Sequence, residues 1–298
     1  MKELAIIDEI RRKHAKPVKG LVEGIGDDCA ILEYTRDEYL LWSTDMIVEN
    51  THFDLKRASY EEVGWKAASV NVSDIAAMGG IPKFITVTFG LPRKGGSAIV
   101  RRLYNGIDKV CREFGIAVVG GDIDGSERLI VDIGILGTVE KKNVAKRSGA
   151  KPGDKILITG PVRDGKKTHL NFMPHIAAGR FLVKNFRVNS MIDTSDGIAM
   201  DLGRICRASE VGCRLYADNI PLPRGLKLED ALHYGESFEL LFTMPPREAK
   251  KLLTESPHKK TAAKFFVIGD ITDKKQGMKI SGKPGSMKTL KMRGFEHL

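Results

Sequence analysis

The 298-residue chain has little cysteine, few aromatic side chains and no long apolar run. Its four cysteines form no C-x-x-C pair and have no histidine at zinc-ligand spacing, so we interpret them as reduced, small apolar side chains. No stretch has the roughly 20 apolar residues of a membrane-spanning helix, and the first residues lack the apolar core of a signal peptide. We therefore expect a cytoplasmic protein without a membrane partner.

Aromatic residues are also missing from the basic clusters of the chain. The net charge is +10, but clusters such as Arg11-Arg12-Lys13 and Lys141-Lys142 are scattered along the sequence. Nucleic-acid platforms combine a continuous basic surface with interleaved aromatic side chains. We therefore expect no nucleic-acid partner, and we attribute the charge to solvated surface and to a general attraction for anionic metabolites.

Acidic residues, by contrast, occur where they are costly. Asp74 is the only acidic residue between Glu62 and Asp108, inside a run of Ala, Ser and Val. A carboxylate near a folded core is destabilising unless it is paired or binds a metal. A helix cap or a salt bridge to Lys66 remains an alternative for Asp74 alone. Five more aspartates share small-residue or apolar surroundings, and together the six indicate a metal-filled cleft: Asp28, Asp45, Asp74, Asp122, Asp193 and Asp196.

Strand and helix patterns alternate in both halves of the chain. The first half predicts strands at 38–43, 82–91, 116–119 and 129–139, and helices at 60–78 and 97–114. The second half predicts strands at 155–159, 190–193, 239–243 and 265–268, and helices at 198–208 and 247–253. A basic Gly/Pro turn at 146–154 separates them. We therefore predict an α/β domain over residues 1–145 and an α+β domain over residues 146–298.

Several polar segments fall where these elements are expected to end. Ser43 and Thr44 offer hydroxyl oxygens beside Asp45, and Gly120-Gly121-Asp122 is expected to stop the 116–119 strand. Asp193 to Gly197 precedes a helix, whose N-terminus attracts anions. Each segment alone could be a cap or a turn. Because like charges repel strongly, so many carboxylates can hold a polyphosphate only through divalent cations.

A further segment nearly matches the Walker A phosphate loop. Gly160 to Thr168 follows a predicted strand, but Lys167 stands where that loop needs a hydroxyl residue. Pro174 also interrupts the helix that should follow. We therefore reject a Walker-type site.

The motifs, taken in order, resemble the thiamine-monophosphate kinase family. They are GIGDDCAIL at 24–32, STD at 43–45, NTHF at 50–53, VNVSDIAAMG at 70–79, GGD at 120–122, RSGAKPGD at 147–154, IDTSDG at 192–197 and GESFELLF at 235–242. The wider ATP-binding superfamily includes aminoimidazole ribonucleotide synthetase, selenophosphate synthetase and a hydrogenase maturation factor. The resemblance implies an α/β N-terminal domain that forms a homodimer through a shared β-barrel, an α+β C-terminal domain, and ATP with several Mg²⁺ ions between the domains.

The resemblance also implies roles for individual residues. Metal ligands would be Asp28, Ser43, Thr44, Asp45, Asp74, Asp122, Asp193 and Asp196. Contacts to ATP would come from Gly121, Asp122, Arg147 and Ser195, and contacts to thiamine monophosphate from His52, Glu236 and Phe295. The implied reaction is in-line transfer of the γ-phosphoryl group of ATP to the substrate phosphate, giving thiamine diphosphate. Because the attacking oxygen is already anionic, we expect no catalytic base, and positioning with metal electrostatics provides the rate.

Two segments depart from the family pattern on the acceptor side. The usual Gly-Gly-Glu-Asp-Tyr-Glu-Leu is here Tyr234-Gly235-Glu236-Ser237-Phe238-Glu239-Leu240. The stretch 160–189 is shortened and lacks a Gly/Ala-rich turn and a His-x-x-Pro-x-Pro-Arg segment. Two alternatives therefore stay open: an enzyme of the same superfamily with another phosphorylated or acyl acceptor, and a non-catalytic ATP-binding homologue.

Overall fold

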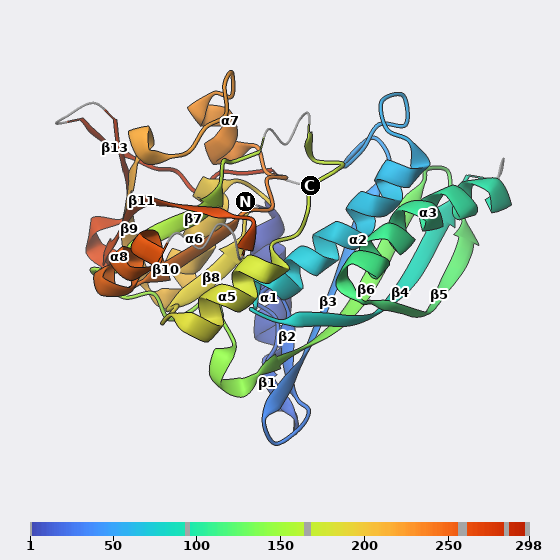
Figure 1. Ribbon diagram of the computed structural model, residues 1–298, viewed down its shortest axis with the longest axis horizontal. Coiled ribbons are helices and arrows are strands. Elements are labelled where there is room, and N and C mark those ends of the chain that lie inside the picture. Colours follow the sequence, from blue (N-terminus) through green and yellow to red (C-terminus); the bar gives the residue numbers. More distant parts are fainter. Residues whose placement is uncertain (1, 93–95, 164–167, 256–260, 283–285, 296–298) are drawn as a thin grey trace.

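The computed structural model describes residues 2–92, 96–163, 168–255, 261–282 and 286–295. Within them the chain forms two mixed sheets, each packed against helices (Figure 1). The first sheet has the strand order β1-β2-β3-β6-β4-β5, and the second has the order β13-β12-β9-β11-β7-β10-β8. No helix in these ranges is long and apolar enough to cross a membrane.

The first sheet is built from residues 21–140. Its strands are β1 (Leu21–Glu23), β2 (Ala30–Glu33), β3 (Glu38–Val48), β4 (Ile81–Leu91), β5 (Ala117–Gly125) and β6 (Ile130–Glu140). Helices α2 (Tyr60–Ala77) and α3 (Gly96–Phe114) cover one face, as Figure 1 shows. Alternation along β3 buries Leu41 and Ile47 and exposes Trp42 and Met46. The other face of this sheet therefore carries exposed apolar side chains.

The second sheet is built from residues 155–289. Its strands are β7 (Lys155–Gly160), β8 (Ser190–Asp193), β9 (Val211–Tyr216), β10 (Leu240–Met244), β11 (Lys264–Asp273), β12 (Met278–Ser281) and β13 (Met287–Thr289). Its helices are α5 (Ile176–Asn185), α6 (Ile198–Ser209), α7 (Leu228–His233) and α8 (Pro246–Glu255), with 3₁₀ turns η1 (Lys141–Asn143), η2 (Ala217–Asn219) and η3 (Lys274–Gln276). The first helix, α1 (Lys2–His14), joins this half through an ion pair between Asp8 and Arg207 of α6.

Helix α2 is buried almost all round and links the two halves. It begins at a capping box in which Ser59 and Glu62 exchange hydrogen bonds. The helix packs on the first sheet, on α3 and on α5. Ala76 shares an apolar cluster with Leu182 of α5, and a Cβ at Gly179 would meet the Ala76 carbonyl oxygen at 2.4 Å. The C-terminal half of α2 is therefore fixed against the second sheet.

Most predicted elements are found, and two strands run further than expected. β3 continues through Thr44-Asp45 to Val48, and β5 continues through Gly120-Gly121-Asp122 to Gly125. β5 pairs in parallel with β4, and a Cβ at Gly121 would meet the Val87 carbonyl oxygen at 1.8 Å. The glycines that suggested a turn therefore allow close strand pairing instead, so the prediction that they stop the strand is wrong.

Two further expectations concern the region after β7. Helix α5 lies in the stretch 160–189, where no helix was predicted. The rejected Walker-like segment includes residues 164–167, which are outside the described residues. All four cysteines are buried and free of disulfides, in agreement with their interpretation as small apolar side chains.

Close packing of α2 on α3 predicts a sensitive glycine. A Cβ at Gly106 would meet the Glu61 carbonyl oxygen at 1.9 Å, whereas a Cβ at Gly96 of the same helix meets nothing within 4 Å. We expect Gly106→Ala to destabilise the protein by about 1–3 kcal/mol through overpacking. The matched control, Gly96→Ala, should be neutral or stabilising by up to about 1 kcal/mol. Thermal unfolding of both variants checks this, and equal melting temperatures would contradict the packing argument.

Candidate functional site

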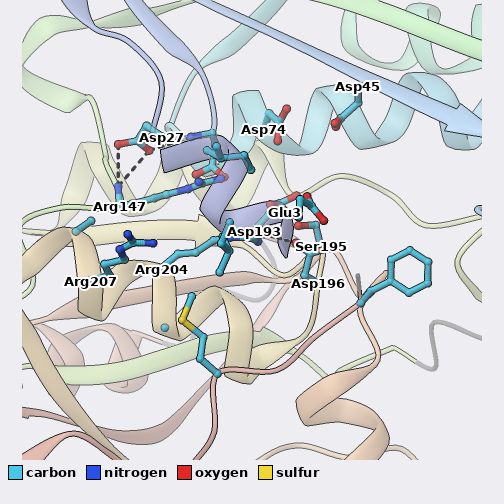
Figure 2. Close-up of a pocket in the computed structure, with 18 of the residues that line it drawn as sticks. Glu3, Asp27, Asp45, Asp74, Arg147, Asp193, Ser195, Asp196, Arg204 and Arg207 are labelled. Carbon is cyan, nitrogen blue, oxygen red and sulfur yellow. Dashed lines mark hydrogen bonds and ion pairs between the residues drawn. The ribbon is translucent and has the colours of Figure 1, made fainter. Parts of the chain in front are cut away.

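Three carboxylates from distant parts of the chain meet between the two sheets. Asp28 precedes β2, Asp74 lies in α2, and Asp193 ends β8. Their oxygen atoms lie within 4.8 Å of one another. Figure 2 shows Asp45 and Asp74 on one side of the cavity and Asp193 with Asp196 on the other. The close contact of α2 with α5 and β8 therefore brings both halves of the site together.

Each of these carboxylates is held by one neighbouring donor. Ser43 Oγ donates to Asp74 Oδ2 at 2.5 Å, and Ser73 Oγ donates to Asp193 Oδ2 at 2.5 Å. Arg147 donates to Asp28 Oδ1 at 2.7 Å. Asp28 Oδ2 is buried and has no hydrogen-bond partner among the described residues. These donors fix the side chains and leave acceptor capacity turned toward the shared centre.

Burial and mutual repulsion make the charged form of this cluster unfavourable. Burial raises the pKa of Asp74 well above its usual value, and the charges of Asp45 and Asp193 raise it further. Burial, followed by the charge of Asp28, likewise raises the pKa of Asp193. For Asp45, burial together with neighbouring aspartates raises the pKa to about 7. The single charge of Arg147 does not balance Asp28, Asp74 and Asp193 together.

The donor set fits hard divalent cations such as Mg²⁺. Such ions bind carboxylate and hydroxyl oxygens, and Ser43 and Thr44 stand beside the aspartates. The unpartnered oxygen of Asp28 is a position that a cation would satisfy. A divalent charge would also remove the cost of ionising Asp74 and Asp193 in a buried site. Asp28, Asp74 and Asp193 therefore form the candidate metal site of the structure.

A second group of charges surrounds Asp196. Arg204 bonds both Asp196 and Asp201, and the Asp196 backbone N–H donates to Asp201 Oδ2 at 3.1 Å. Burial raises the pKa of Asp201 to about 7, against the opposing charge of Arg204. Asp196 is therefore neutralised in part by Arg204, as Asp28 is by Arg147, whereas Asp74 and Asp193 accept from serine hydroxyl groups.

The opposite end of the site is built around a buried lysine. Lys66 of α2 is fully buried, and its Nζ donates to Glu236 Oε1 at 2.5 Å and to the His52 carbonyl oxygen at 2.7 Å. His169 Nδ1 lies 2.8 Å from Lys66 Nζ and 2.8 Å from Glu236 Oε2. Burial raises the pKa of Glu236, but the His169 hydrogen bond and the Lys66 charge outweigh it, so the pKa lies below its usual value.

Backbone contacts join the two ends of the site. The Glu236 N–H donates to the Ser195 carbonyl oxygen at 2.7 Å, and the Phe295 N–H donates to the Asp196 carbonyl oxygen at 3.1 Å. A Cβ at Gly235 would meet Ser195 O at 1.9 Å, so only glycine permits this approach. The ring of Phe295 lies 6.2 Å from that of His52. These contacts fix the carboxylate cluster, which we call the metal end, relative to His52 and Phe295, which we call the aromatic end.

One cavity of about 970 Å³ contains both ends. Its lining includes the carboxylate cluster, then Lys66, Glu236 and His52, and apolar side chains of α1 such as Leu4 and Ile7. Its volume suits a nucleotide together with a second small molecule.

Comparison with known proteins identifies the family. Family models described as AIR synthase related protein, N-terminal domain and C-terminal domain, match residues 26–139 and 133–280. The thiamine-monophosphate kinase of Buchnera aphidicola subsp. Schizaphis graminum is 32% identical over 99% of this chain and 98% of its own length. The chain belongs to the thiamine-monophosphate kinase family. The kinase of that name from Bacillus subtilis (strain 168) is 31% identical over 92% of this chain and 93% of its own.

Solved structures agree with this membership. The structure of AaThiL complexed with AMPPCP and TMP superposes with a TM-score of 0.79 and 29% sequence identity. It covers 100% of this chain and 98% of that chain. The predicted architecture, an α/β domain followed by an α+β domain of the aminoimidazole ribonucleotide synthetase type, is confirmed.

The structure brings most of the predicted site residues of this thiamine-monophosphate kinase family member to the cavity. The residues that line it are Asp28, Ser43, Thr44, Asp45, His52, Asp74, Arg147, Asp193, Ser195, Asp196, Glu236 and Phe295. Gly121 and Asp122 do not line it, because β5 is the exposed edge strand of the first sheet.

Sequence reasoning missed or misplaced several residues of the site. Lys66 pairs with Glu236 and not with Asp74. His169 lies in the stretch described above as lacking the His-x-x-Pro-x-Pro-Arg segment. The letters His169-x-x-Phe172-x-Pro174-His175 keep that spacing with two substitutions, so a relaxed match would have found it. The contribution of α1 had no local signal, because a helical pattern does not show what the helix contacts.

The carboxylate cluster predicts that the stability of the metal-free protein depends on pH. Because the pKa of Asp45 is raised to about 7, the folded protein holds more protons than the unfolded chain between about pH 4 and 7, and the raised pKa of Asp74 acts in the same direction. Stability of the metal-free protein should therefore fall as pH rises through about 7. We expect Asp74→Asn to raise the metal-free melting temperature at pH 8 by about 2–4 °C for each kcal/mol of repulsion removed.

The same variant should lose the increase in melting temperature that Mg²⁺ gives the unmodified protein. Asp37→Asn, at an exposed turn, is the matched control and should change neither quantity. Thermal scans at pH 5 and pH 8, with and without Mg²⁺, measure both effects. A metal-free Asp74→Asn protein less stable than the parent at pH 8 would refute the repulsion argument.

Proposed function

We propose that this chain transfers the γ-phosphoryl group of ATP to the phosphate of thiamine monophosphate, giving thiamine diphosphate and ADP. The observation that carries the proposal is the cavity that joins the cluster of Asp28, Asp74 and Asp193 to the rings of His52 and Phe295. Relatives across nearly the full length bear the name of this kinase, and AaThiL was solved with AMPPCP and TMP. We place the protein in the cytoplasm on the same grounds.

The chain's own residues suit this reaction by positioning. Asp28, Asp74 and Asp193 would hold Mg²⁺, with Ser43, Thr44, Asp45 and Asp196 as further oxygen ligands. When bound, Mg²⁺ would neutralise the negative charge of the transferred phosphoryl group and of the oxygens that donate and accept it. Arg147 and Ser195, which line the cavity, would contact ATP; the resemblance also implies contacts from Gly121 and Asp122, which lie outside the lining. No base is needed, because the acceptor oxygen is anionic at neutral pH.

At the aromatic end, contacts with the organic part of the acceptor would come from His52, Glu236 and Phe295. Glu236 carries a negative charge, which favours a cationic ring nearby. Aromatic faces attract the same kind of group. The thiazolium of thiamine is such a ring. Lys66 and His169 would act as positioning residues, because both hold Glu236 and Lys66 also holds the His52 carbonyl group.

Tyr234 and Ser237, which depart from the family motif, are not among the residues that line the cavity. Ser237 Oγ accepts a hydrogen bond from the Arg163 N–H at 3.0 Å, and Ser237 is not part of the cavity lining. Tyr234 packs edge-on against Phe295, with 6.5 Å between ring centroids. The replacement at 237 thus serves internal packing, and the replacement at 234 supports the aromatic end.

We also propose a homodimer. The face of the first sheet opposite α2 and α3 exposes Trp42, Met46 and Phe84, which are 57%, 54% and 46% exposed. A second copy seated on this face would bury these side chains, in line with the barrel that the resemblance implies.

The direct test is an assay of purified protein with ATP, Mg²⁺ and thiamine monophosphate, with thiamine diphosphate measured by chromatography. We expect diphosphate and ADP in equal amounts. Formation of ADP only with another phosphorylated or acyl acceptor would favour the alternative enzyme. Magnesium-dependent ATP binding without ADP from any acceptor would favour the non-catalytic homologue.

Phe295→Ala tests the aromatic end separately from the metal end. Loss of an aromatic contact worth about 1 kcal/mol should raise KM for thiamine monophosphate about fivefold and leave KM for ATP unchanged. Tyr34→Ala, an exposed aromatic residue in the β2–β3 turn, is the matched control and should behave like the parent. Steady-state kinetics with each substrate varied gives both constants, and a rise in KM for ATP alone would contradict the assignment.

A further inference from the structure

A second cavity, of about 450 Å³, lies in the C-terminal half of the chain. Its titratable lining residues are Arg163, His175, Arg224 and Glu239. They come from the segment after β7, the N-cap of α5, the loop before α7 and the residue before β10. Among the described residues, none that lines this cavity also lines the 970 Å³ cavity. The second cavity is therefore separate from the site of the proposed function, which assigns it no role.

Two nitrogen atoms in the wall of this cavity lack hydrogen-bond partners. The side chain of Arg163 is 29% exposed and that of His175 is 13% exposed. Arg163 Nε and His175 Nε2 are buried, and neither makes a hydrogen bond within the described part of the chain. A buried polar group without a partner is destabilising, and an unoccupied ligand site is one reason for it. Both nitrogens therefore indicate an acceptor that the described residues do not supply.

Glu239 lies beside both cations without bonding to them. Its Oε1 is 3.3 Å from Arg163 Nε and its Oε2 is 2.7 Å from His175 Nε2, in directions that do not allow a hydrogen bond. Oε2 accepts instead from Thr159 Oγ1 at 2.5 Å. The Glu239 side chain is only 2% exposed, so its charge is set back behind the two cations.

Arg224 gives the cavity an excess of positive charge. It is exposed, and it has no ion pair or hydrogen bond with any other residue that the structure describes. Two arginines against one glutamate leave one positive charge in excess, even when His175 is neutral. A concave surface with such an excess attracts anions. Guanidinium groups also present a fork of N–H donors that matches two oxygens of a phosphate group.

Part of the segment that nearly matches the Walker A loop forms one wall of this cavity. Gly160 to Arg163 and Thr168 line it. The two objections to a Walker-type site were the displaced hydroxyl residue, which is a magnesium ligand, and the interrupted helix. Neither objection applies to a phosphate group that arginine side chains hold without a metal ion.

We propose that this second cavity binds the phosphate group of a small anion, with Arg163, His175 and Arg224 as its donors. Phosphate oxygens would accept from the nitrogens that the described residues leave unpaired. The volume of about 450 Å³ leaves room for an organic group attached to the phosphate. Because the donors are cationic, this site needs no divalent cation, in contrast to the cluster of Asp28, Asp74 and Asp193.

Equilibrium dialysis of the full chain against radiolabelled inorganic phosphate tests the proposal. A chelator removes divalent cations, so the carboxylate cluster of the 970 Å³ cavity repels phosphate. Sodium chloride at about 0.15 M screens weak attraction to the surface. We expect one saturable site per chain with a Kd of about 1 mM or tighter. Acetate should compete more weakly than sulfate, because sulfate is also tetrahedral.

Two variants and a matched control locate the bound phosphate. Arg224→Gln and Arg163→Gln should each weaken binding about tenfold, because each removes a charge-assisted contact. Arg187→Gln, an exposed arginine of the same half that lines neither cavity, should bind like the parent. Arg163 is largely buried, so circular dichroism checks the fold of its variant. Arg224 is exposed, so the Arg224→Gln result decides the question if the other variant misfolds.

Arg147→Gln distinguishes the two cavities, because Arg147 lines the 970 Å³ cavity alone. It should keep the metal-free phosphate site. The proposal is overturned if phosphate binding does not saturate, if Arg187→Gln and Arg224→Gln weaken it equally, or if Arg147→Gln abolishes it while Arg224→Gln does not. Tighter binding of acetate than of sulfate would overturn the assignment of a phosphate group. The dialysis contains no ATP and no acceptor, so failure of the proposed kinase activity would leave its result unchanged.

Discussion

The repulsion among Asp28, Asp74 and Asp193 is the constraint on which the rest of the structure depends. Three carboxylates with oxygens within 4.8 Å of one another are unstable in a buried site without a counter-charge. The fold nevertheless imposes this arrangement through helix α2, which packs on both halves of the chain. The protein thus holds in place a group of carboxylates whose ionised form its own burial disfavours, and a divalent cation would offset that cost.

The aromatic end is fixed by a different kind of interaction. Lys66 satisfies its buried ammonium group with Glu236, with the His52 carbonyl group and with His169. These partners come from three separate segments, so one cation sets the relation among them. The backbone bonds from Glu236 to Ser195 and from Phe295 to Asp196 then tie this end to the metal end. The relative position of the two ends of the cavity therefore depends on a continuous set of contacts.

The sequence predicts the fold and the gathering of most of the acidic residues, because the relevant signals are local. An aspartate amid Ala, Ser and Val at 74, or in a turn before a helix at 193, is visible without knowledge of its partners. The partner of Lys66 could not be predicted, since Glu236 is 170 residues away in the chain. The extent of β5 was missed for a similar reason: Gly120-Gly121 resembles a turn until β4 is placed beside it. Strand order, which decides where Asp122 lies, is likewise a property of the whole sheet.

The contact between Gly179 and Ala76 has a consequence for how ligands exchange. It allows no side chain between α5 and α2, so the two halves cannot hinge apart at this point without breaking a close backbone contact. Helix α1 lines the same cavity and is joined to α6 through an ion pair between exposed side chains, an interaction worth about 0–1 kcal/mol. Any opening of the cavity therefore has to leave the contact between α5 and α2 intact, whereas α1 is a part of the wall that can move without breaking that contact.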